Sequence, residues 1–182
     1  TPDVSSAASD VYKRQAYRDE TNTNLKYAYY NGSSWINMTL DGNWQGVDNV
    51  GEYVSLQLDS GNWPHIAYYN ATAGDLMYMY NDGSAWYKST AYSTNNVGAH
   101  ASLSLDSNDN AHIAHYNMQF QNLMYTNFGG GNWTTEPVDS VGRVGEYCAI
   151  AIDANDSPHI AYVDRDNGCL LYTSPSPRDG SE

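Results

Sequence analysis

The sequence repeats with a period of 47 residues, and this self-similarity restricts the possible fold more than any other feature. Three segments of 21 residues align without gaps: VGEYVSLQLDSGNWPHIAYYN (50–70), VGAHASLSLDSNDNAHIAHYN (97–117) and VGEYCAIAIDANDSPHIAYVD (144–164). A second set of segments ends each time in Gly-x-x-Trp: 24–35, 75–86 and 122–133. Because a fixed period of this length is typical of repeat architectures, we expect one structural unit to be copied along the chain.

Each unit is predicted to contain four β-strands joined by tight turns. In the unit that begins at Val50, the predicted strands are 53–59, 64–70, 75–80 and 86–92. The first strand alternates apolar and small or polar residues, and the second begins with Pro64, where a strand tolerates proline. Asn-Asp-Gly at 81–83 is a hairpin signal. The 17 tyrosines and 15 glycines favour strands and turns over helices.

Four antiparallel strands in about 40–50 residues is the period of a β-propeller blade. A β-sandwich with accidental periodicity is the alternative, and gap-free repeats with fixed anchors disfavour it. Large residues such as Leu56 and Leu58 alternate with small or polar ones, so the large face of one blade can pack on the small face of the next. We predict an all-β fold, a partial β-propeller of about three four-stranded antiparallel blades with a 47-residue repeat.

Both ends of the chain resemble translated DNA rather than natural protein. Residues 5–15 (SSAASDVYKRQ) and 169–179 (CLLYTSPSPRD) match the translations of the two transposon adapters used to prepare sequencing libraries. We expect 1–15 and 169–182 to be adapter-derived and 16–168 to be native. The native part then divides into a partial blade, two blades and a partial blade, at 16–49, 50–96, 97–143 and 144–168. Cys148 is the only cysteine in that part.

The encoding DNA tests this interpretation. We expect the codons for residues 5–15 and 169–179 to read as the adapter strings, which share one internal element as reverse complements. Sequencing of the source DNA will check this, and different codons at these positions would contradict it.

Nine residues are kept in equivalent positions of the units: Asp59, Asp106 and Asp153; His65, His112 and His159; Trp35, Trp86 and Trp133. We interpret them as structural repeat anchors, with one hydrogen-bonded structural histidine in each blade, for example bound to a neighbouring turn, and with the tryptophans in the core. A shared zinc site is the alternative for the histidines. Equivalent residues of neighbouring blades are expected to lie too far apart for Zn–N distances of about 2.0–2.1 Å. We therefore predict no metal ligands.

Charge and composition limit the partners and cofactors. The net charge is −13, and residues 16–168 carry five Lys and Arg against 17 Asp and Glu, which argues against a nucleic-acid partner. No apolar run reaches 18 residues, so we expect no membrane span. We expect no cofactor. The turns 106–110 and 153–157 alternate oxygen-bearing side chains as calcium loops do, but no glutamate closes them, so Ca²⁺ is only an alternative.

The pattern LDS-x-x-x-PHIAYYN followed by DLMYMYNDGSAW resembles the bacterial and archaeal propeller repeats related to sialidase-type (BNR or Asp-box) and fucose-lectin-type propellers. The resemblance covers residues 16–168 and implies the propeller fold. An Asp-box reads Ser-x-Asp-x-Gly-x-x-Trp, whereas Asp82 stands one place late before Gly83 and Trp86. Sialidases hold their substrate with an arginine cluster, which Arg18, Arg143 and Arg165 do not reproduce. We therefore expect no catalytic residues and no enzyme activity in this chain.

Non-equivalent or loop-edge aromatic residues and neighbouring carboxylates are the candidate ligand-binding residues: Glu52, Tyr53, His100, Glu146, Tyr147, Trp44 and Trp63. Aromatic faces with carboxylates suit sugars, because ring faces stack and acids accept hydrogen bonds from hydroxyls. We predict a non-catalytic propeller of a secreted or cell-surface microbial protein that binds a glycan or a protein. The alternatives are the propeller of a sialidase-like glycoside hydrolase, with its catalytic residues in further blades, and a structural spacer or adhesin repeat. Those further blades are expected to belong to the same chain.

Overall fold

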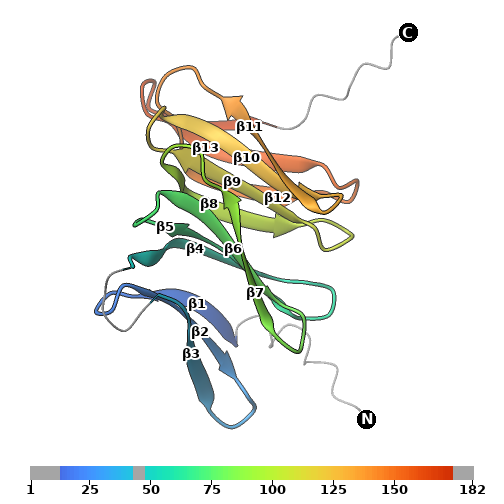
Figure 1. Ribbon diagram of the computed structural model, residues 1–182. Coiled ribbons are helices and arrows are strands. Elements are labelled where there is room, and N and C mark those ends of the chain that lie inside the picture. The colour runs from blue at the N-terminus through green and yellow to red at the C-terminus, as the bar shows by residue number, and fades with distance from the viewer. Residues whose placement is uncertain (1–12, 43–47, 174–182) are drawn as a thin grey trace.

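The computed structural model describes residues 13–42 and 48–173, which form fourteen strands and no helix, so no helix in this part could cross a membrane. The prediction of an all-β chain is confirmed. Four antiparallel sheets follow one another along the chain (Figure 1). The first sheet contains β1 (Arg14–Asp19), β2 (Asn24–Tyr30) and β3 (Trp35–Asp41). The fourth contains β12 (Val144–Ile152), β13 (Pro158–Asp164) and β14 (Cys169–Thr173).

The two middle sheets each have four strands in the order of the sequence. The second sheet contains β4 (Val50–Leu58), β5 (Pro64–Asn70), β6 (Asp75–Asn81) and β7 (Trp86–Tyr92). The third contains β8 (Val97–Leu105), β9 (Ala111–Asn117), β10 (Asn122–Gly129) and β11 (Asn132–Asp139). The predicted strands 64–70 and 86–92 are therefore confirmed. The predicted start of the first strand, at residue 53, is wrong, since β4 begins at Val50. Pairing with β5 continues on the N-terminal side of a bulge, where Val50 lies opposite Asn70.

The adapter-like segment at the C-terminal end forms a strand. Cys169–Thr173 is β14, and it pairs with β13 along its length. Leu170 and Tyr172 fall at the repeat positions that Leu76 and Tyr78 occupy in β6. The segment therefore carries the apolar and aromatic pattern of a third strand, which is sufficient for pairing.

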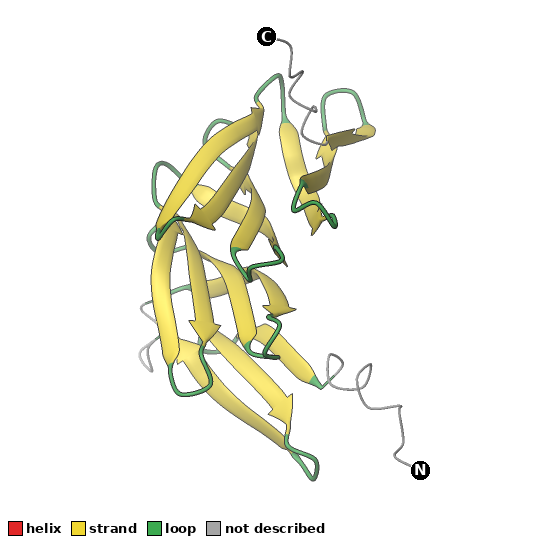
Figure 2. Cartoon of the chain, turned by 90° about the vertical axis from the view of Figure 1, so that its right-hand side faces the viewer, coloured by secondary structure: helices red, strands yellow, loops and turns green. Residues whose placement is uncertain are grey.

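The sheets are stacked one on the next in an arc (Figure 2), with β4, β8 and β12 in contact along one side of the stack. The core is divided into three clusters, one between each pair of consecutive sheets. At the first boundary, Leu25 and Tyr27 of β2 pack against Ile66 and Tyr68 of β5. The small faces of the first strands contribute hydrogen bonds instead: the Ser55 hydroxyl accepts from the Leu103 amide at 3.0 Å. Each apolar cluster is thus buried only when two sheets meet.

A glycine joins each sheet to the one before it. Gly51, Gly98 and Gly145 have φ of 87°, 101° and 99°, in the left-handed region. A Cβ atom at these positions would lie 2.9, 2.8 and 2.6 Å from the Cα atoms of Leu25, Leu76 and Leu123, on the preceding sheet. The amide before each glycine donates to that sheet as well, as Val97 N does to Gly74 O at 3.0 Å. We call these three contacts the glycine clasps.

A tyrosine–aspartate hydrogen bond joins neighbouring sheets at the first and third boundaries, and an aromatic contact replaces it at the second boundary. The Tyr68 hydroxyl donates to Asp41 at 2.6 Å, and the Tyr162 hydroxyl donates to Asp139 at 2.8 Å. At the equivalent positions between the second and third sheets stand His115 and Tyr92, whose rings are 6.3 Å apart. His115 is fully buried, and its Nε2 lies 2.9 Å from the Thr126 hydroxyl, while Nδ1 has no hydrogen-bond partner among the described residues.

The glycine clasps predict a specific sensitivity to added side-chain volume. Gly98→Ala should lower the free energy of unfolding by about 2–5 kcal/mol, because it combines a left-handed alanine with a clash against the Leu76 backbone. Urea denaturation will measure this loss. The matched control is Gly130→Ala, at φ 61° with open space around the added methyl group, for which about 1 kcal/mol is expected. Equal losses for the two variants would contradict the clasp.

Burial of His115 predicts a loss of stability in mild acid. Burial lowers the pKa of His115 to about 3, below its usual value, so the unfolded chain binds a proton that the folded chain excludes. This contribution is present above the unfolded pKa of about 6.5 and is lost as the pH falls, by about 2 kcal/mol at pH 5. Urea denaturation of the wild type and of His115→Gln at pH 7.5 and 5 will test it. The variant should lose about 2 kcal/mol less between these pH values, and an identical loss would contradict the assignment.

Candidate functional site

Three aromatic residues occupy one position of the first strand in consecutive sheets. Tyr53, His100 and Tyr147 lie two residues after the glycines of the clasps, in β4, β8 and β12. Their φ angles are 51°, 54° and 51°, which is uncommon for residues other than glycine. The residue before each of them (Glu52, Ala99 or Glu146) pairs with the second strand, and the strand register shifts both before and after that pair. Each aromatic residue therefore lies in a β-bulge. The same backbone irregularity is therefore copied three times.

The bulges bring the three rings into contact. The ring centroids of Tyr53 and His100 are 4.5 Å apart, and those of His100 and Tyr147 are 4.4 Å apart. Tyr69 and Tyr116 support Tyr53 and His100 from the second strands, at 6.2 and 6.1 Å. Tyr53 is 40% exposed and Tyr147 is 62% exposed. We call Tyr53, His100 and Tyr147 the aromatic row.

A carboxylate precedes each tyrosine of the row. Glu52 accepts a hydrogen bond from the Asn49 side-chain amide at 3.2 Å and lies 3.4 Å from the Arg18 guanidinium. Glu146 accepts from Arg165 Nε at 2.7 Å. Five of the predicted ligand-binding residues, Glu52, Tyr53, His100, Glu146 and Tyr147, are thus brought together on one face. Sequence analysis did not identify the arginines as part of this surface.

The surroundings of the row modify its titration. Burial lowers the pKa of His100, with the nearby Glu146 opposing this effect, so the imidazole is neutral at pH 7. Burial also raises the pKa of Tyr53, and the charge of Glu52 adds to that increase. At neutral pH the rings of Tyr53 and His100 are therefore uncharged.

The other two predicted ligand-binding residues are not part of the row. Trp44 lies outside the described residues. Trp63 lies in the turn after β4, at the opposite end of that strand from Tyr53. Its indole packs against Gly83, where a Cβ atom would come within 2.6 Å of the ring. The tight hairpin at 81–83 therefore fixes the position of this indole.

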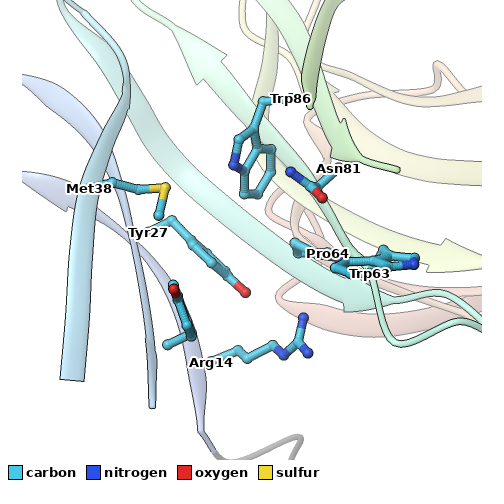
Figure 3. Close-up of a pocket in the computed structure, with 8 residues that line it drawn as sticks. Arg14, Tyr27, Met38, Trp63, Pro64, Asn81 and Trp86 are labelled. Atoms are coloured by element: carbon cyan, nitrogen blue, oxygen red, sulfur yellow. The ribbon is translucent and has the colours of Figure 1, made fainter. Parts of the chain in front are cut away.

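Trp63 borders a cavity of about 280 Å³ between the first and second sheets (Figure 3). The lining residues are Arg14, Tyr27, Tyr29, Met38, Trp63, Pro64, Asn81 and Trp86. Asn81 accepts a hydrogen bond from the Gly83 amide at 2.8 Å, which fixes the orientation of its side chain. Sequence analysis did not predict this cavity, because Tyr27, Tyr29 and Met38 stand at ordinary strand positions. The only signal is Trp63 itself, since the next unit has Asn110 at that position.

The tryptophan anchors join neighbouring sheets. Trp86 meets Tyr27 edge to face at 5.2 Å, and Trp133 meets Tyr78 in the same way at 5.0 Å. Each tryptophan thus covers a tyrosine of the preceding sheet. The prediction that Trp35 is in the core is wrong in this structure, since its side chain is 47% exposed. Its sheet is the first in the described part of the chain, so no earlier sheet there supplies the tyrosine.

The histidine anchors lie between an aspartate and a tyrosine of their own sheet. Their Nδ1 atoms are hydrogen-bonded to the hydroxyls of Tyr78, Tyr125 and Tyr172, from His65, His112 and His159 respectively. Their Nε2 atoms lie 3.4, 3.5 and 3.1 Å from the carboxylates of Asp59, Asp106 and Asp153. Within 13–42 and 48–173, no three His, Cys, Asp or Glu side chains are grouped to hold a metal ion.

The turns that resemble calcium loops use their carboxylates as hydrogen-bond acceptors. Asp106 accepts from the amides of Asn108 and Asn110, at 2.9 and 2.8 Å. Asp109 reaches the preceding sheet, where it accepts from the amide and the hydroxyl of Ser60 at 2.9 and 2.6 Å. Asp156 binds Ser107 in the same way. These turns therefore connect neighbouring sheets at the end of the stack opposite the row.

Within the described residues, two surfaces are suited to a ligand: the aromatic row and the partly open cavity beside Trp63. The row has fixed rings with charged groups beside them, and the cavity is mainly apolar. Comparison with known proteins adds no relative to this description, since no protein-family model matches the chain and no curated protein does.

Proposed function

We propose that the chain is part of a β-propeller that binds a glycan or a protein, without catalysis, through the aromatic row and its flanking carboxylates. The observation that carries this proposal is the contact of three rings on one face, with centroids 4.4–4.5 Å apart; the two tyrosines are exposed and His100 between them is half-buried. Exposed aromatic side chains provide large contact areas with few rotatable bonds. Rings held by a recurring bulge lose little further freedom when a ligand binds.

The stacking of the sheets supports the propeller part of the proposal. The sheets follow the order of the chain, and their first strands contact one another along one side of the stack. The exposure of Trp35, whose counterparts cover a preceding sheet, favours further blades from the same protein. We place this protein in the secreted or surface-displayed class, where a binding propeller meets external glycans and proteins.

Two features favour binding over catalysis. Glu52 and Glu146 occupy equivalent positions of different sheets. They are copies of one position, and not two residues with different roles, as a catalytic pair requires. Each is engaged by a cation or an amide of the protein itself. A catalytic acid and base need defined and different roles, and two equivalent carboxylates that are held by groups of the chain itself do not indicate such a pair.

A binding screen with a matched pair of variants tests the proposed function. Glycan and peptide arrays are probed with the wild type, and the affinity for the best ligand is then measured for Tyr53→Asn/Tyr147→Asn. Asparagine tolerates the left-handed backbone, so this variant removes the rings while keeping the bulges. We expect at least a tenfold loss of affinity, typical of aromatic residues at the centre of an interface.

Tyr87→Ala is the control, because Tyr87 is 45% exposed on β7, outside the row. Its affinity should equal that of the wild type. A ligand that binds the double variant and the wild type equally would contradict the assignment of the row. Failure to bind on either array would contradict the proposed function.

A further inference from the structure

A guanidinium group of the chain itself occupies one end of the aromatic row. Arg165 Nε and Nη2 both lie 2.7 Å from Glu146 Oε2. The guanidinium carbon of Arg165 lies 5.4 Å from the ring centroid of Tyr147. A carboxylate beside an aromatic face is an established way to hold a planar cation. The Glu146–Tyr147 pair is therefore an example, within this chain, of a cation site built on the bulge.

The same backbone frame recurs at Glu52 and Tyr53. Tyr53 and Tyr147 have the same φ of 51°. The Arg165 amide donates to Arg143 O at 2.9 Å, and the Ala71 amide donates to Asn49 O at 2.8 Å. Ala71 is therefore the structural counterpart of Arg165. Because alanine carries no cationic group, residue 71 places no guanidinium beside Tyr53, which is 40% exposed.

The middle unit differs from both ends. Its residues at these positions are Ala99, His100 and Met118, and the Met118 amide makes the corresponding hydrogen bond to Asn96 O at 2.8 Å. With Ala99 in place of a glutamate, this unit has neither the carboxylate nor the arginine. Among the three units, only the one with Tyr53 combines the carboxylate and the ring with an uncharged residue at the arginine position.

The charges around Tyr53 favour a cation. Arg18 Nη1 lies 2.9 Å from Glu20 and 3.4 Å from Glu52, so one guanidinium is shared between two carboxylates. The group has a net negative charge, whereas the Arg165–Glu146 pair is neutral. An open cavity of about 370 Å³ lies here, and Tyr17, Arg18, Glu20, Glu52 and Tyr53 are among its lining residues. This space accommodates the end of a basic side chain.

We infer that Glu52, Glu20 and Tyr53 bind the guanidinium or ammonium group of a basic peptide segment on a partner protein. This inference rests on the proposed function and specifies its ligand. The bound group takes the place at Tyr53 that Arg165 takes at Tyr147, and the chain's net charge of −13 favours the approach of a basic partner.

Nuclear magnetic resonance titration of the ¹⁵N-labelled chain with N-acetyl-arginine amide tests the inference. We expect saturable shifts of the amides of residues 51–54. N-acetyl-citrulline amide, which has a similar shape and no charge, should bind at least tenfold more weakly. Ala71→Arg should weaken arginine binding at least fivefold, because it supplies an internal guanidinium. Met118→Arg adds the same charge at the same turn position beside His100 and should leave arginine binding at Tyr53 unchanged.

Three results would overturn the inference: equal binding of citrulline, no effect of Ala71→Arg in a variant that melts like the wild type, or equal weakening by both arginine variants. Stronger binding of glucosamine than of arginine would also overturn it, in favour of an amino sugar. The array measurement on Tyr53→Asn/Tyr147→Asn separates the two proposals. Loss of the array ligand without arginine binding contradicts only the cation site, whereas an unaffected array ligand contradicts the proposed function.

Discussion

The close contact between a glycine of one sheet and a leucine backbone of the previous sheet is the constraint on which the structure depends. Gly51, Gly98 and Gly145 approach so closely that a methyl group has no space. The clasp sets the lateral position of each sheet and brings β4, β8 and β12 into contact. Because the aromatic row follows the glycines by two residues, the contact that joins the sheets also determines the spacing of the rings.

The row has an energetic cost that the stack must offset. A left-handed backbone at a residue other than glycine costs about 1–2 kcal/mol, and Tyr53, His100 and Tyr147 all adopt it. The contacts within the row, with ring centroids 4.4–4.5 Å apart, and those with Tyr69 and Tyr116 offset part of this cost. A smaller residue would avoid the exposure of two tyrosines. Retention of large rings at strained, exposed positions is therefore more easily explained by binding than by stability.

The repeat was sufficient to predict four strands in each unit but not the start of the first strand, because periodicity reports the local pattern of pairing and burial. It predicted β5 and β7 with their boundaries and selected Glu52, Tyr53 and His100 as candidate ligand-binding residues. It could not predict the left-handed backbone at Tyr53, which no turn motif marks and which depends on the clasp two residues earlier. It also could not predict the exposure of Trp35 or the cavity beside Trp63. The exposure of Trp35 and the shape of the cavity depend on which residues of the neighbouring sheet face them. The sequence of a single unit does not contain this information.

The differences between the repeat units help to distinguish residues that pack the core from residues that can bind a ligand. The replacement of a tyrosine and an aspartate by His115 and Tyr92 changes both members of one contact, as expected when a core must stay filled. The replacement of Arg165 by Ala71 is matched only in part. Glu52 and Tyr53 keep the residues that hold the guanidinium at Glu146 and Tyr147, but the cation near Glu52 is Arg18 of the preceding sheet, which is shared with Glu20. A retained carboxylate and ring with no arginine from the same turn form a site that is complementary to a cation from outside the chain. In a repeat protein, binding specificity can arise at such a difference between units, because the residues that all units have in common hold the sheets together.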